Sequence, residues 1–133
     1  MVLVDTSAWI TSFKKTGHPD LKEFMRQVVV SGQAVTSQII ILELLQGCRS
    51  GEERDALRIK LESLDILPLS QAVWEQAYEL AFSLRRKGLT VPTTDLIIAA
   101  LAIENKSVLL HHDEHYERIV SHYPTLHARC FGL

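Results

Sequence analysis

Two aspartates follow short apolar runs, a placement in which a carboxylate can serve a bound cation. Asp5 comes directly after Val2–Val4, and Asp113 comes soon after Ser107–Leu110. Short apolar, β-branched runs that end at polar residues predict buried strands. If the strands are parallel, their carboxyl ends meet at one edge of the sheet, where functional groups gather. We therefore expect both aspartates in one site.

Two further acids lie in segments so apolar that their charge stands out. Glu43 is inside the run Ile39–Leu45, and Asp95 opens a run that continues to Ile103. Both runs predict buried helices. A buried carboxylate is costly unless it is paired or bound to a metal, and neither run supplies a basic partner.

Each acid taken alone has an ordinary structural explanation. Asp5 or Asp95 would serve as a helix cap, and Asp113 as a turn or cap residue. Glu43 would pair with a distant arginine. The four together are better explained by a shared cation. Carboxylates without cysteine or histidine partners suit hard cations such as Mg²⁺ or Mn²⁺, which hold phosphate oxygens and activate water. The pattern predicts a metal-dependent phosphoryl-transfer or phosphodiester-cleaving site.

The segments that must position these acids alternate between strand and helix. The predicted strands are Val2–Val4, Ala34–Thr36, Ile66–Leu69, Ser107–Leu110 and, at an edge, Leu126–Phe131. The predicted helices begin near Ala8, Pro19, Ser37, Glu52, Ser70, Asp95 and Glu114. Serine or threonine precedes several of these starts and would cap the helix, with Thr6 and Ser7 capping the first. The alternation predicts an α/β fold with a parallel sheet covered on both faces.

The composition excludes several classes of protein. The chain has 133 residues, 47% hydrophobic and 23% charged, which predicts one folded domain over 1–133 and excludes wholesale disorder. Two cysteines exclude a disulfide framework, and no apolar run approaches the roughly 20 residues of a membrane span. We expect a soluble, cytoplasmic protein without membrane contact. A net charge of −2 does not exclude nucleic acid, because setting four acids aside leaves 14 basic against 12 acidic residues.

The chain resembles the PIN domain, and within it the VapC-type toxins of bacterial and archaeal toxin–antitoxin pairs. The segments that carry the resemblance are, in order, Val2–Ser7, Glu43 in its helix, Asp95–Ala100 and His112–Tyr116. The resemblance covers the whole chain. It implies a three-layer α/β/α sandwich, a Mg²⁺- or Mn²⁺-dependent endoribonuclease, a homodimer, and an antitoxin protein that inhibits by occupying the active-site groove.

The resemblance also assigns roles to particular residues. The metal-binding, catalytic acids are Asp5, Glu43, Asp95 and Asp113. Ser7 matches the Asp-x-Ser opening and would support Asp5 by hydrogen bonding. Many relatives have another acid two residues after the last aspartate, where this chain has His115. This departure weakens the case for a second tightly held metal and makes His115 a candidate contact for phosphate or water. Cleavage by activated water would leave a 5′-phosphate and a 3′-hydroxyl.

Basic and aromatic groups elsewhere each have two interpretations. The candidate RNA contacts are Lys14, Lys15, Arg85, Arg86 and Lys87. The last three also suit a plain helix end, where cations meet the negative end of the dipole. The helical stripe of Trp74, Tyr78 and Phe82 predicts core or dimer interface rather than a base-stacking platform. A second apolar face for self-association is predicted around Leu57, Leu61 and Leu64.

Three other functions compete with the nuclease. A zinc site among the clustered histidines is disfavoured, because His111 and His112 should point in opposite directions at a strand end. A phosphatase with Asp5 as nucleophile commonly needs a second acid two residues later, where this chain has Ser7. A catalytically weak binding domain of the same fold would not need to retain all four acids.

Overall fold

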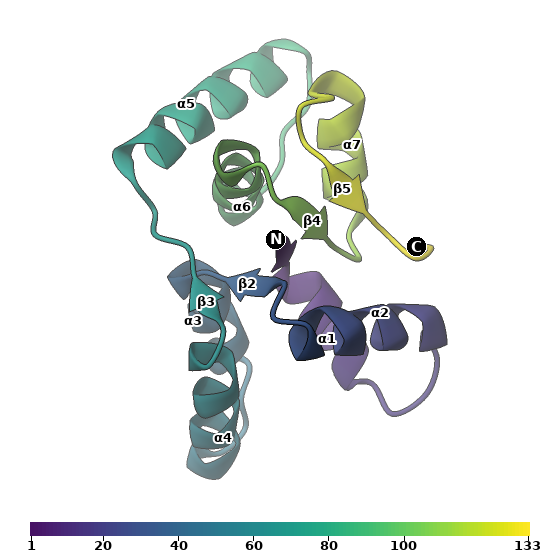
Figure 1. Cartoon of the computed structure of the whole chain (residues 1–133). Helices are drawn as coiled ribbons and strands as arrows, with labels where there is room; N and C mark the ends of the chain where they lie inside the picture. Colours follow the sequence, from purple (N-terminus) through teal and green to yellow (C-terminus); the bar gives the residue numbers. More distant parts are fainter.

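Five parallel strands form one sheet in the order β3-β2-β1-β4-β5 (Figure 1). The computed structural model describes residues 1–133. The strands are β1 (Val2–Val4), β2 (Ala34–Thr36), β3 (Asp65–Ile66), β4 (Val108–Leu110) and β5 (Ala128–Arg129). Leu3 in the central strand aligns with Val35 on one side and Leu109 on the other. The chain's two ends therefore supply neighbouring strands in the middle of the sheet.

The two edge strands are shorter than the sequence predicts. The third predicted strand, Ile66–Leu69, is paired only as Asp65–Ile66. Leu67 still donates its N–H to the Thr36 carbonyl at 2.8 Å, but Pro68 has no N–H with which to continue the ladder. The last predicted strand, Leu126–Phe131, is paired only at Ala128–Arg129.

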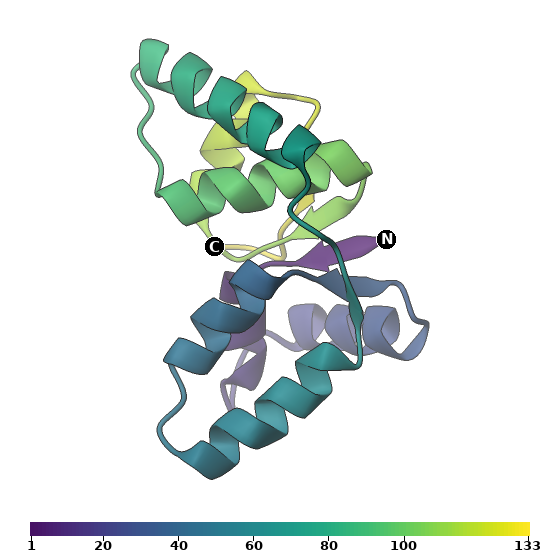
Figure 2. The ribbon, with the colours of Figure 1, turned by 90° about the vertical axis from the view of Figure 1, so that its left-hand side faces the viewer.

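Helices cover both faces of the sheet, which confirms the predicted α/β/α sandwich (Figures 1 and 2). One face carries α1 (Thr6–Phe13), α2 (Pro19–Val30), α3 (Gln38–Gln46) and α4 (Gly51–Glu62). The other carries α5 (Gln71–Arg86), α6 (Thr93–Asn105) and α7 (Glu114–His122). None of these helices combines the length and apolarity that crossing a membrane requires.

Side-chain caps begin five of these helices, α1, α3, α4, α5 and α7. Ser37, Ser50 and Ser70 each accept the backbone N–H of the residue three positions on. The first helix is capped by Asp5, as the ordinary structural explanation of that residue predicted, and not by Thr6 or Ser7. Asp5 accepts the N–H of Ser7 at 2.9 Å. A capping carboxylate also meets the positive end of the helix dipole, so its charge is stabilised where the strand ends.

Helix α6 is the most buried helix and fixes the position of Asp95. Every residue from Ile97 to Ala102 is buried, since α6 lies between the sheet and α5 (Figure 2). Each fully buried leucine or isoleucine contributes about 1.5–3 kcal/mol relative to exposure. The first turn of α6 is therefore held on a rigid element.

The structure contradicts part of one prediction about apolar stripes on the outer helices and narrows the other. Leu61 on α4 is fully buried in the core, so it offers no surface for self-association. On α5 the core side chains are instead Val73, Ala77, Leu80 and Leu84. Tyr78 and Phe82 are 60% and 62% exposed, so their stripe is not core.

Candidate metal centre

Three aspartates from separate elements converge at the carboxyl edge of the sheet. Asp5 follows β1 directly, and its N–H donates to the carbonyl of Leu110, the last residue of β4. Asp113 caps α7 just beyond β4, and Asp95 lies in the first turn of α6. Because β1 and β4 are adjacent parallel strands, they bring residues 5 and 113 together from opposite ends of the chain (Figure 1).

Asp5 is almost completely buried and is held from two sides. Its Oδ2 accepts hydrogen bonds from both the N–H and the hydroxyl of Ser7. The Ser7 hydroxyl oxygen in turn accepts the N–H of His112 at 2.9 Å, which ties the loop after β1 to the loop after β4. The other carboxylate oxygen of Asp5, Oδ1, accepts a hydrogen bond from the Tyr116 hydroxyl at 2.7 Å. These contacts fix the orientation of the carboxylate.

His115 joins Asp95 and Asp113. Its Nδ1 lies 3.0 Å from Asp95 Oδ2 and 3.2 Å from Asp113 Oδ1. One ligand atom from each of the three residues lies within 4.8 Å of the others. The backbone N–H of His115 also donates to Asp113 Oδ1 at 2.9 Å, which is the helix cap of α7. The three side chains therefore face a common point.

Glu43 lies at the margin of this group. The Thr6 hydroxyl donates to Glu43 Oε1 at 2.7 Å, and Thr6 is the residue after Asp5. Glu43 comes from α3, on the opposite face of the sheet from α6 (Figure 2). The Glu43 carboxylate is half-buried. The pKa of Tyr116 is raised mainly by burial and by the charges of Asp5 and Asp95, and the charge of Glu43 adds a smaller effect. The predicted acids thus comprise a central three and one outer member.

Tyr116 is a site residue for which the sequence analysis found no role. Its side chain is fully buried, and its hydroxyl lies 2.7 Å from Asp5 Oδ1 and 3.3 Å from Asp95 Oδ1. A tyrosine three positions after Asp113 lies on the same side of α7 as that aspartate, and this spacing is the signal that could have identified it. The phenol is the only side chain bonded to both Asp5 and Asp95.

The electrostatics of the group favour a cation. No lysine or arginine forms an ion pair with any of the four acids. Burial, reinforced by the charges of Asp5 and Asp113 and opposed by His115, raises the pKa of Asp95 to about 6. Carboxylates that lie close together, one of them with a raised pKa, suit a divalent ion with oxygen ligands. The residues present therefore fit the predicted metal.

The raised pKa of Asp95 predicts how the metal-free protein responds to pH. Between about pH 4 and pH 6 the native state holds a proton that the unfolded chain has released, so the free energy of unfolding should fall as pH rises. We expect a loss of roughly 1–2 kcal/mol, less than the full shift implies because water reaches the site. Denaturant unfolding at several pH values, with a chelator present, measures this fall in the free energy of unfolding. Asp95→Asn should flatten that dependence, and an unchanged profile in the variant would contradict the assignment.

The basic candidates lie outside the cluster. Lys14 and Lys15 are exposed at the end of α1. The pKa of His112 is lowered by burial, by His18 and, to a smaller extent, by the charge of Lys14. At the end of α5, Arg86 and Lys87 stack on the rings of Phe82 and Tyr123. Arg85 lines a small pocket with Leu96, the neighbour of Asp95. None of the five is bonded to the acids.

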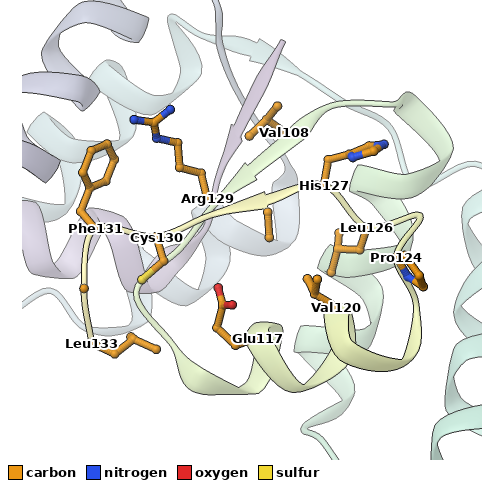
Figure 3. A pocket seen from close by; sticks show the side chains of 12 residues that line it. Val108, Glu117, Val120, Pro124, Leu126, His127, Arg129, Cys130, Phe131 and Leu133 are labelled. Atoms are coloured by element: carbon orange, nitrogen blue, oxygen red, sulfur yellow. The ribbon is translucent and has the colours of Figure 1, made fainter.

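A second group of potential metal ligands consists of His111, Glu117 and Cys130, of which Glu117 and Cys130 line a pocket beside β5. Figure 3 shows Glu117 extending from α7 toward the segment that carries Cys130. His111 is fully buried; its Nε2 lies 2.9 Å from Glu117 Oε1, and its Nδ1 accepts the Asp113 N–H at 3.2 Å. Both ring nitrogens are thus engaged, and burial raises the pKa of the Cys130 thiol. His111 therefore supports the turn at Asp113, whose N–H its Nδ1 accepts.

Comparisons with known proteins agree with the fold. A family model described as PIN domain matches residues 2–121. The chain is 28% identical to the VapC ribonuclease Mb1587 of Mycobacterium bovis, over 98% of this chain and 99% of the relative. Among solved structures, VapBC2 of Rickettsia felis bound to a promoter DNA fragment matches with a TM-score of 0.81 and 23% identity, over 98% and 99% of the two chains. DNA-bound VapBC of Salmonella typhimurium matches with a TM-score of 0.79 and 19% identity, over 97% and 96%.

Proposed function

This chain belongs to the PIN domain family, and from that premise we propose that it is a metal-dependent endoribonuclease, the toxin of a toxin–antitoxin pair. The observation that carries the proposal is the convergence of Asp5, Asp95 and Asp113 at one sheet edge without a lysine or arginine partner. Support comes also from curated relatives named as ribonucleases, which align with nearly the whole chain.

The cation would be Mg²⁺ or Mn²⁺, held by Asp5, Asp95 and Asp113, with Glu43 positioned at the margin through Thr6. When bound, it would supply the chemistry of water activation and of charge neutralisation on the scissile phosphate. Ser7 and Tyr116 hold the Asp5 carboxylate in one orientation, so no reorganisation is needed during the reaction. The partly exposed side of the group, formed by Asp113 and His115, leaves room for the RNA backbone.

We propose two kinds of macromolecular contact. The RNA would meet exposed cations at the ends of α1 and α5, which would hold its phosphates. These residues are Lys14, Lys15, Arg85, Arg86 and Lys87. The second partner is an antitoxin protein that covers the site, because solved structures of the same fold are described as toxin–antitoxin complexes, including one from Klebsiella pneumoniae.

The products of cleavage test the mechanism. We expect RNA fragments with a 5′-phosphate and a 3′-hydroxyl, formed only when a divalent cation is present, because water and not the 2′-hydroxyl is the nucleophile. Histidine acid–base catalysis would need two free imidazoles, whereas His111 is buried and His112 packs against His18 with ring centres 5.0 Å apart. End-group analysis decides the matter: a 2′,3′-cyclic phosphate formed in EDTA would exclude the proposed reaction.

We further propose that the protein forms a two-fold dimer through the exposed face of α5. Tyr78 and Phe82 project from that helix with most of their surface in solvent, which is unusual for large aromatic side chains. Replacing both with serine should convert a dimer into a monomer in sedimentation at micromolar concentration. Val30→Ser, at an equally exposed position on α2, is the control and should leave the dimer intact. A wild-type protein that sediments as a monomer would refute the proposal.

The competing functions are not favoured. A phosphatase acid–base group at position 7 is absent, since the Ser7 hydroxyl is occupied by Asp5 and by the His112 N–H. A binding domain without catalysis would have no need for three buried or half-buried aspartates that repel one another. Metal-dependent RNA cleavage that is lost in Asp95→Asn separates this last alternative from the nuclease.

A further inference from the structure

We propose that His115 is a direct ligand of the bound cation, which gives the centre a mixed nitrogen and oxygen donor set that favours Mn²⁺ over Mg²⁺. The inference rests on the proposed metal centre and specifies its selectivity. It starts from the three side chains that share one point, which are Asp95, Asp113 and His115. Two of them are the expected acids, and the third offers an imidazole nitrogen.

The spacing of the three donor atoms suits adjacent ligands of one ion. His115 Nδ1 lies 3.0 Å from Asp95 Oδ2 and 3.2 Å from Asp113 Oδ1. Neighbouring ligands of an octahedral ion with bonds of roughly 2.1 Å are about 3.0 Å apart. The donors would need to move very little to bind a cation. In its absence, a proton on Nδ1 can bridge the same two carboxylates.

The backbone holds the imidazole in this orientation. The His115 N–H donates to Asp113 Oδ1 in the cap of α7, so the ring begins the helix next to one of the acids. Its side chain is 31% exposed, and that of Asp113 is 32% exposed, while Asp95 is 14% exposed. The deeper carboxylate and the two shallower groups therefore leave an entry path for a hydrated ion.

An imidazole ligand changes which ion the centre prefers. Mg²⁺ strongly favours oxygen ligands and gives up its water reluctantly. Transition-metal dications accept imidazole more readily, with Mn²⁺ the weakest binder of that series. Mn²⁺ also accepts the oxygen ligands that Mg²⁺ uses, so the contribution of the nitrogen is the part of the preference for Mn²⁺ that is lost when the imidazole is removed. Replacing the imidazole with a carboxylate should shift the preference back toward Mg²⁺.

The opposite interpretation is that His115 only neutralises the acids while no cation is bound. In that case a cation must displace the ring, and removal of the ring would strengthen metal binding. Direct ligation predicts the reverse, because loss of a ligand weakens binding. The two interpretations therefore differ in the sign of one measurement, the change in Mn²⁺ affinity in His115→Ala.

The test uses the full-length protein with Mn²⁺ alone, followed by calorimetry and by electron spin resonance. We expect nitrogen hyperfine coupling to bound Mn²⁺, a loss of Mn²⁺ affinity of at least about tenfold in His115→Ala, and a similar fall in the Mn²⁺-to-Mg²⁺ affinity ratio in His115→Asp. His122→Gln, at an exposed position on the same helix, is the control and should retain all three properties.

The outcomes separate this inference from the proposed function. Binding of Mn²⁺ without nitrogen coupling, or tighter binding by His115→Ala, would overturn the ligand assignment and leave the metal centre standing. Absence of any Mn²⁺ or Mg²⁺ binding, with the protein folded by circular dichroism, would overturn both. Nitrogen coupling that survives in His115→Ala but disappears in His122→Gln would place the nitrogen ligand elsewhere and refute the inference.

Discussion

Asp95→Asn should abolish RNA cleavage while making the metal-free protein more stable. The amide keeps the shape of the carboxylate but removes the charge, so the cation loses a central ligand. We expect activity to fall by more than the roughly 10–100-fold that loss of an outer partner costs. Stability should rise at neutral pH, because the native state no longer contains an ionised Asp95 beside Asp5.

The matched control for this variant is Asp20→Asn. Asp20 lies in the first turn of α2, as Asp95 lies in the first turn of α6, so both substitutions remove an acid from a helix N-terminus. Asp20 is exposed and bonded to no other acid, and its loss should leave cleavage unchanged. Cleavage of a labelled RNA and thermal unfolding in chelator measure both effects. Full activity in Asp95→Asn would refute the assignment of the site.

Tyr116→Phe should weaken metal binding by about 10–100-fold, because the phenol orients two ligands without touching the cation. Removing the hydroxyl leaves Asp5 Oδ1 without its donor at 2.7 Å and removes the group that lies between Asp5 and Asp95. The variant should also lose stability by roughly 1.5–3 kcal/mol, as expected for a hydrogen bond to a charged group. Its effect on stability is thus opposite in sign to that of Asp95→Asn.

Calorimetric titration with Mn²⁺ and denaturant unfolding measure these two effects. A high concentration of the cation should restore much of the cleavage by Tyr116→Phe, since the metal ligands themselves remain. Tyr123→Phe is the control, because that tyrosine follows the same helix and its hydroxyl forms no hydrogen bond with the acids. Unaltered metal affinity in Tyr116→Phe would show that the Asp5 carboxylate does not depend on the phenol.

The parts of the site that could be predicted from sequence are those with a local cause. Asp5 and Asp113 follow apolar runs, and Asp95 opens one, so their burial and strand-end placement can be inferred from short segments. The sequence offered Asp5, Thr6 and Ser7 as caps of α1 without choosing among them, because all three residue types favour helix starts and local preference does not decide which polar residue stays outside the helix.

The parts that could not be predicted depend on contacts between distant residues. The Tyr116 hydroxyl meets Asp5 from 111 positions away, and no local pattern reports that distance. His115 was expected to contact phosphate or water, whereas its ring lies against Asp95 and Asp113. This contact depends on how α6 and α7 pack against each other. The stripe of Tyr78 and Phe82 shows the same limit, since the position of α6 decides which side of α5 is covered.

The adjacency of β1 and β4 has a consequence for the timing of synthesis. Ser7 and His112 are 105 positions apart and are joined only when β4 pairs with β1. At elongation rates of roughly 5–20 residues per second, the ribosome needs several seconds to reach Asp113 after completing Asp5. During that interval the nascent chain carries some of the acids but no assembled centre. The centre therefore assembles only after β4 has been made and has paired with β1, and a chain that ends before Asp113 lacks it.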